Sequence, residues 1–190
     1  MNQDSAFLLS DDRFKSILQS PRVAAHLLND DGTYPNNGKL PLMVYQGAML
    51  LPEASRATVF EALFGANQWG SSWRDGVYGY HHYHSTAHEV LGVYGGTAQV
   101  QFGGEHRVVL SVNAGDVVVI PAGVAHKNLG ASRGFRVVGA YPLGQQWDLC
   151  YGDPDERPRA DQNIAHVPLP VADPVYGTDG PLIEHWSEQN

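Results

Sequence analysis

Lysine and cysteine are both scarce in this 190-residue sequence. It has only three lysines, and 20 acidic residues against 12 Lys and Arg residues give a formal net charge of −8. Because no basic stripe occurs, we expect neither nucleic acid nor an anionic membrane as a partner. The single cysteine, Cys150, has no partner for an intramolecular disulfide and no activating base near it in the sequence. We therefore interpret it as a passive thiol, as expected in a reducing compartment.

Long apolar runs are also absent. No stretch approaches the roughly 18–20 apolar residues that a membrane helix needs. The short apolar run at 6–9 has no basic segment before it, so it does not predict a secretory signal. We expect a cytoplasmic protein. With 43% hydrophobic and 17% charged residues, the composition is typical of a single globular domain.

Within that single domain, residues 1–70 are interpreted as a helix and strand extension packed on a barrel. Ser20 and Pro21 resemble a helix start, and the apolar residues that follow at helical spacing are Val23, Ala24, Leu27 and Leu28. Residues 41–46 predict a strand. Pro52 opens a second expected helix, whose apolar stripe is formed by Val59, Phe60, Leu63 and Phe64. This zone predicts one or two N-terminal helices.

Residues 71–145 have a different pattern, in which short apolar or alternating runs are separated by glycine-rich turns. Such spacing indicates an antiparallel sandwich or barrel, so the fold class is mainly all-β. Residues 146–190 form a Pro-rich C-terminal extension, which we expect to be mostly extended or irregular and to pack along the barrel. The expected strands are Tyr78–His84, Glu89–Tyr94, Thr97–Phe102, Arg107–Val112, Asp116–Ile120, Val124–Leu129 and Phe135–Tyr141.

A group of histidines points to chemistry. Because side chains two apart on a strand share a face, His82 and His84 project together. A hairpin can fold Glu89 back beside them, and His126 lies on a later strand just after a Pro-Ala-Gly turn. Three imidazoles and one carboxylate suit a divalent transition metal (Fe, Mn, Ni, Cu or Zn) better than Ca or Mg. A histidine-rich strand that simply faces solvent is the alternative interpretation. The other nearby histidines, His81 and His88, are expected to lie outside the ligand set.

The surrounding residues match two spaced signatures. The first runs Gly76, five residues, His82, one, His84, four, Glu89, six, Gly96. The second, at the end of the zone, is Gly115, five residues, Pro121, one, Gly123, two, His126. Together they resemble the two signatures of the cupin superfamily. The chain departs from the second at its final position, where Gly130 replaces an expected Asn that is a turn residue and not a ligand.

The resemblance implies a single antiparallel jelly-roll β-barrel with one divalent metal held by His82, His84, Glu89 and His126. It does not select a reaction, because cupins catalyse many. We favour a metal-dependent enzyme of the dioxygenase type that acts on a small organic molecule. The alternatives are a cupin isomerase or epimerase and a non-catalytic small-molecule-binding cupin. Similar small cupins pair through flanking segments, so a homodimer is expected.

Strand parity adds candidates for the lining of the pocket. If the ligands point inward, the residues that share their faces are Tyr78, Tyr80, Leu91, Val93 and Asn128. Each aromatic residue is equally compatible with simple barrel filling. Arg74 and Arg136 are able to anchor a substrate carboxylate, although a surface salt bridge is the favoured interpretation for both.

Overall fold

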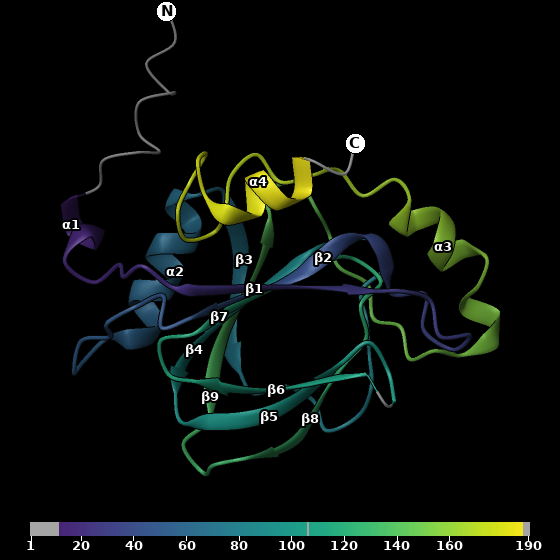
Figure 1. The fold of residues 1–190 in the computed structure, drawn as a ribbon, viewed down its shortest axis with the longest axis horizontal. Coiled ribbons are helices and arrows are strands. Elements are labelled where there is room, and N and C mark those ends of the chain that lie inside the picture. The colour runs from purple at the N-terminus through teal and green to yellow at the C-terminus, as the bar shows by residue number, and fades with distance from the viewer. Residues whose placement is uncertain (1–11, 106, 188–190) are drawn as a thin grey trace, which may run out of the picture.

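The computed structural model describes residues 12–105 and 107–187, and its strands form two antiparallel sheets. The larger sheet contains, in spatial order, β1 (Arg22–Leu28), β2 (Asn37–Gln46), β7 (Val117–Ile120), β4 (Glu89–Gly95), β9 (Arg136–Pro142) and β3 (Trp69–Asp75). The smaller sheet contains β6 (Val108–Asn113), β5 (Thr97–Phe102) and β8 (His126–Ala131). The smaller sheet lies beneath the larger one in Figure 1. This arrangement confirms the expected mainly β jelly roll.

Alternation along the central strands builds two apolar layers. On β4 and β7, one set of residues packs between the two sheets, and it includes Leu91, Val93 and Val118. The other set, which includes Val90 and Val119, faces the opposite side of the larger sheet. Since successive side chains of a strand point to opposite faces, both layers come from the same strands.

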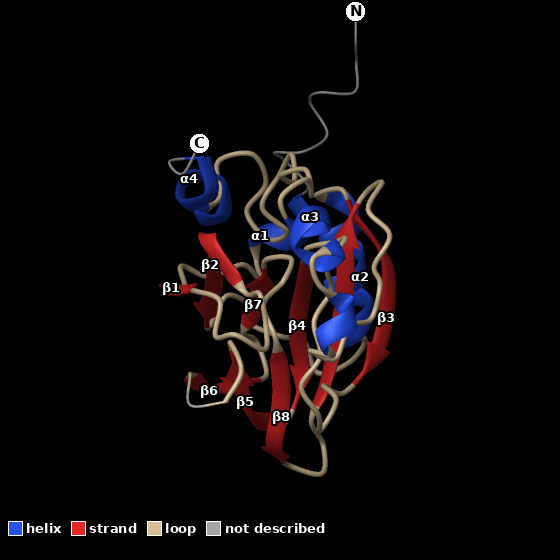
Figure 2. Ribbon diagram, turned by 90° about the vertical axis from the view of Figure 1, so that its right-hand side faces the viewer, coloured by secondary structure: helices blue, strands red, loops and turns tan. Residues whose placement is uncertain are grey.

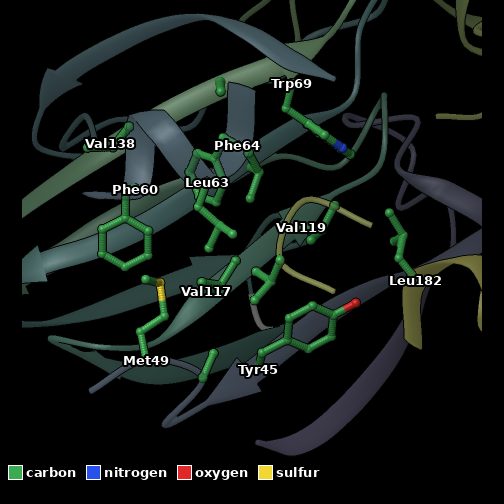
Figure 3. Close-up of a cluster of buried hydrophobic side chains, with 14 of the residues drawn as sticks. Tyr45, Met49, Phe60, Leu63, Phe64, Trp69, Val117, Val119, Val138 and Leu182 are labelled. Atoms are coloured by element: carbon green, nitrogen blue, oxygen red, sulfur yellow. The ribbon is translucent and has the colours of Figure 1, made fainter. Parts of the chain in front are cut away.

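The outer layer is covered by α2 (Arg56–Ala66), as expected from its apolar stripe. Phe60, Leu63 and Phe64 are buried against the strands, and Figure 3 shows them gathered over Val117, Val119 and Val138. The close approach depends on Gly92, where an added Cβ would lie only 2.4 Å from the Phe60 ring. Figure 2 shows α2 beside the strands of this sheet.

One expected helix is wrong. The residues after Ser20 form strand β1, which pairs antiparallel with β2 from Arg22↔Gln46 to Leu28↔Asn37. The apolar residues there are compatible with either period, because Ala24 and Leu28 pack against the interior while Val23 and Leu27 lie exposed on the other face. Pairing with β2 therefore outweighs local helical spacing.

The tail is mostly irregular, as expected. It also contains a short 3-10 turn at Pro154–Glu156 and two short helices, α3 (Arg159–Ile164) and α4 (Pro181–Ser187). Its anchor is the buried Asp173, whose carboxylate accepts hydrogen bonds from the Tyr45 hydroxyl and the Leu182 backbone N–H. A further short helix, α1 (Asp12–Lys15), stands at the start of the described chain.

Two strand predictions also change. The segment expected as the strand Tyr78–His84 makes only isolated bridges, His82↔His126 on one side and Tyr83↔Cys150 on the other. Conversely, β3 was not predicted. The expected strand at 41–46 begins four residues earlier, as β2 (Asn37–Gln46), and the other expected strands occur with shifts of at most two residues at either end. Among the described residues, no helix is long and apolar enough to cross a membrane.

Candidate metal centre

Three histidines meet inside the barrel at one end. His82 and His126 exchange backbone hydrogen bonds of 3.2 and 2.9 Å, which hold the 81–89 segment against the first residue of β8. His84 follows two positions later, so it shares the side of His82. Tyr83 points away and is buried beside Ala125 and Cys150. Strand parity therefore applies even though this segment is not a regular strand.

The imidazoles are close enough to share one ion. One ring nitrogen from each of His82, His84 and His126 lies within 4.8 Å of the others, and all three residues are buried. Glu89, the first residue of β4, adds a buried carboxylate: its Oε2 atom lies 3.6 Å from His84 Nε2 and 3.3 Å from His126 Nε2. The structure thus brings together all four residues that the sequence singled out.

The orientation of each ring is set by a backbone carbonyl. Nδ1 of His82 lies 3.3 Å from the Tyr80 carbonyl, and Nδ1 of His126 lies 3.2 Å from that of Val124. Nδ1 of His84 contacts the carbonyl of Asp148. Because a carbonyl can only accept, these contacts favour the tautomer that carries its proton on Nδ1, and a neutral ring in that tautomer has its lone pair on Nε2.

Glu89 is oriented by a buried hydroxyl. The Tyr141 hydroxyl on β9 donates to Glu89 Oε1 at 3.1 Å and accepts a hydrogen bond from Trp73 Nε1 at 3.0 Å. The other oxygen of the carboxylate, Oε2, is buried without a hydrogen-bond partner among the described residues. A buried carboxylate oxygen without such a partner is costly unless a cation neutralises it.

The charges are consistent with this geometry. Burial, together with the charge that His126 would carry when protonated, lowers the pKa of His82 to about 3. Burial acts to lower the pKa of His84 as well, but the adjacent Glu89 carboxylate outweighs it and the pKa is raised. For Glu89, burial acts to raise the pKa, yet His84 and His126 outweigh it and hold the pKa below its ordinary value. The Glu89 carboxylate therefore stays ionised beside the imidazoles.

These residues fit a divalent transition metal. Three neutral imidazole nitrogens and one carboxylate oxygen are the donor types that such ions prefer. One ring nitrogen of each histidine lies within 4.8 Å of the others, and the unpartnered Glu89 Oε2 lies beside His84 and His126. The backbone carbonyls that receive the Nδ1 protons are the usual second partners of metal-binding histidines.

A cavity of about 220 Å³ opens onto this cluster. Of the predicted pocket residues, Tyr78 and Leu91 line it. Tyr80, Val93 and Asn128 are not among its lining residues. The Tyr80 ring stacks outside on Tyr78 at 4.9 Å, Val93 packs within the apolar core, and the Asn128 side chain accepts a hydrogen bond from the Gly130 backbone N–H.

The remaining candidates have structural partners. His88 is fully buried outside the cluster, and its Nδ1 accepts a hydrogen bond from the Ala122 backbone N–H at 3.0 Å. Arg74 lines the cavity but forms a bidentate ion pair with Glu61, with both contacts at 2.6 Å. Arg136 donates to the adjacent Phe135 carbonyl. His81 turns away from the cluster and packs against Tyr34.

Sequence reasoning missed the residues that support the ligands. Strand parity along Phe135–Tyr141 would have placed Tyr141 inside. Val137 lies four residues earlier, on the same face of the strand, and it faces the interior. Asp148 and Trp147 lie in the tail, where no periodic pattern predicts that a backbone carbonyl would reach His84. Only the folded chain brings them there.

Comparison with known proteins identifies relatives of this chain. A family model described as Cupin matches residues 76–140. The uncharacterized protein YjlB of Bacillus subtilis (strain 168) is 44% identical over 157 residues, which cover 83% of this chain and 92% of YjlB.

Solved structures resemble the chain more distantly. The dTDP-6-deoxy-D-glucose-3,5-epimerase RmlC of Legionella pneumophila is 16% identical, with a TM-score of 0.34 over 63% of this chain and 71% of its own. The DMSP lyase DddQ of Ruegeria pomeroyi DSS-3 is 17% identical, with a TM-score of 0.33 over 80% of this chain and 61% of its own. At these scores neither structure supports an inference about chemistry.

Proposed function

Because the chain belongs to the cupin superfamily, we propose that it is a metal-dependent enzyme acting on a small organic molecule. In this proposal His82, His84, Glu89 and His126 hold one divalent transition metal. One observation carries it: four donor groups converge at the inner end of a cavity, and the cavity leaves one side of the cluster open. An open side is the feature that separates a catalytic metal site from a structural one.

The lining of the cavity favours a dioxygenase over an isomerase or epimerase. Isomerisation by proton transfer needs an acid or base whose pKa lies near neutrality. Of the two lining tyrosines, Tyr78 stacks on Tyr80. Tyr141 is committed to Glu89, and burial followed by the charge of Glu89 raises its pKa. Asp75, the remaining carboxylate in the lining besides Glu89, is exposed and accepts a hydrogen bond from the Gly76 backbone N–H.

The metal therefore has to supply the chemistry, and the chain supplies the setting. A redox-active ion such as Fe(II), held by histidine and carboxylate, would provide oxygen activation beside the bound substrate. Tyr141 keeps Glu89 Oε2 turned toward the histidines, and the three backbone carbonyls favour the tautomer in which each Nε2 is unprotonated. The apolar walls exclude bulk water from the reacting end of the substrate.

The first test is elemental analysis of protein purified without chelator or nickel resin. We expect about one equivalent of a transition metal per chain. Binding is expected to weaken as the pH falls, because protons compete for the imidazole lone pairs, first at His84 with its raised pKa. Absence of any bound metal, even after incubation with Fe(II), Mn(II) or Zn(II), would contradict the proposal.

The second test separates the reaction classes. The iron-loaded chain is screened for oxygen uptake with a set of small oxygen-bearing organic compounds. Substrate-dependent uptake supports the dioxygenase. Conversion without oxygen uptake would identify an isomerase or epimerase, and binding without any conversion would identify a non-catalytic cupin.

We further propose that the chain forms a homodimer through its flanking segments. The edge strand β1 leaves Val23 and Leu27 36% and 51% exposed, and exposed apolar edges are ready to pair with another chain. Sedimentation equilibrium at micromolar concentration tests this, and a monomeric mass would contradict it.

A further inference from the structure

Aromatic rings line the cavity beside the metal-binding cluster. The Trp147 ring stacks on the Tyr141 ring, with centroids 5.9 Å apart and planes inclined by 19°. The Trp147 ring also meets His84 edge to face, with centroids 5.6 Å apart. Leu149 and Leu91 continue the lining with apolar surface. Next to the metal ligands, the cavity thus offers ring faces and methyl groups.

The indole N–H of Trp73, the Tyr141 hydroxyl and the Arg74 guanidinium in this wall already have partners. Trp73 Nε1 donates to the Tyr141 hydroxyl, and that hydroxyl donates to Glu89. Arg74 is the one guanidinium among the lining residues, and it is held by Glu61 and by the Thr58 hydroxyl. An occupant therefore finds no free cation in the wall with which to pair a second anionic group. The positive charge that an anionic oxygen donor needs is therefore left to the metal-binding end.

Trp147 is half exposed, yet the segment that carries it is fixed on both sides. The Asp148 carboxylate accepts hydrogen bonds from the Ser85 backbone N–H and hydroxyl. On the other side, the Thr86 hydroxyl donates to the Gln146 carbonyl at 2.7 Å. An exposed indole on an anchored backbone costs little entropy when a ligand binds against it.

We propose, on the basis of the metal centre above, that this site takes a flat apolar ring that carries an oxygen donor. The ring lies against Trp147 and Tyr141, and the oxygen donor reaches the metal held by the histidines and Glu89. The cavity of about 220 Å³ limits the occupant to a small molecule, since cavities for larger ligands measure about 300–1,000 Å³. The ligand class is thus a small aromatic compound with one metal-binding oxygen group.

Two hydroxamic acids test this proposal because they share a metal-binding group and differ in their body. The full chain is loaded with Co(II), whose visible spectrum reports ligand binding, and titrated with benzohydroxamic acid and with acetohydroxamic acid. Their affinities for aqueous Co(II) set the baseline ratio. We expect the loaded chain to prefer benzohydroxamic acid over acetohydroxamic acid by a ratio about 10- to 100-fold larger than this baseline. Burial of a phenyl ring accounts for a difference of that size.

The matched variants are Trp147→Leu and Tyr151→Leu. Both remove a half-exposed aromatic ring, 50% and 47% exposed respectively, but Tyr151 does not line the cavity. We expect Trp147→Leu to reduce the preference for benzohydroxamic acid by about 3- to 10-fold, the range for loss of an aromatic contact. We expect Tyr151→Leu to leave it unchanged. Metal content is measured in every sample, so affinities are compared on loaded protein.

The possible outcomes separate this proposal from the one on which it rests. If the wild-type chain binds no Co(II), the metal centre fails and the ring site fails with it. If Co(II) binds but the two acids show only the baseline ratio, the ring site is overturned and the metal centre stands. Equal loss of preference in both variants would also overturn it, because the effect would not come from the cavity wall.

Discussion

The two faces of the larger sheet are built from the same strands and have opposite properties. On its outer face, Val90, Val119 and Val138 pack against α2 and the tail in a closed apolar layer. On its inner face, alternate residues of these strands form a similar apolar layer, but it ends at Glu89 and Tyr141, beside the histidines and the cavity. The difference shows that the outer face stabilises the sheet, which leaves one end of the inner face free to carry buried polar groups.

The largest expected effect is on the inner face. Replacing His126 or His84 with Ala removes one of four ligands and leaves Glu89 incompletely neutralised, so metal content should fall from about one equivalent to near zero. His88→Ala is the control, because His88 is buried but lies outside the cluster. Mass spectrometry of metal content checks all three variants. Full occupancy in the His126 variant with loss in the His88 variant would show that the ligand assignment is wrong.

A substitution on the outer face should lower the stability of the fold and leave the metal content unchanged. Phe60 is fully buried against Gly92, and Phe60→Ala leaves a cavity in the outer layer. We expect the free energy of unfolding to fall by about 3–5 kcal/mol, while the folded variant keeps its metal equivalent. Denaturant unfolding and elemental analysis measure the two quantities. Loss of metal from the folded variant would show that the outer face does not act on stability alone.

His88 provides an intermediate effect that depends on pH. Burial lowers its pKa to about 3, whereas the unfolded chain protonates near pH 6.5. The stabilisation that depends on neutral His88 is therefore fully present above pH 6.5, and it is lost as the pH falls from 6.5 toward 3. Between pH 7 and pH 5 the metal-free chain should lose about 2 kcal/mol through this group.

The variant His88→Asn isolates that contribution. Asparagine does not titrate, and its Oδ1 atom lies at the position of the His88 Nδ1 that accepts the Ala122 N–H. Denaturant unfolding at the two pH values should give a smaller loss for the variant than for the wild type. Equal losses would show that His88 does not remain neutral in the folded chain.

The smallest expected effect concerns Tyr141, which joins the wall of the cavity to the ligands. Tyr141→Phe removes the hydrogen bond to Glu89 Oε1 and keeps the ring that stacks on Trp147. Metal affinity should weaken by about 10-fold, as is usual for the loss of a group that orients a ligand. Competition with a chromophoric chelator measures this. An unchanged affinity would mean that packing alone orients Glu89.

The candidate site was more predictable than parts of the fold. His82, His84, Glu89 and His126 could be chosen because spacing and strand parity depend only on the sequence. The strand β1 was mistaken for a helix, since its apolar residues satisfy both periods and only pairing with β2 decides between them. For the pocket candidates, strand parity predicts which residues share a face, but it does not show how far the cavity extends along that face. Val93 therefore lies in the core, whereas Tyr78 lines the cavity.

The sequence by itself determined which residues are able to bind a metal and that side chains two positions apart, such as His82 and His84, share a face. Local periodicity and turn residues are sufficient for this, because they act over a few neighbouring positions. Only the tertiary structure decided what holds those residues in place. The Asp148 carbonyl at His84, the Tyr141 hydroxyl at Glu89 and the anchored Trp147 arise from contacts between segments more than 50 residues apart. Such contacts depend on how the tail and β9 pack on the barrel, and no local pattern encodes that packing.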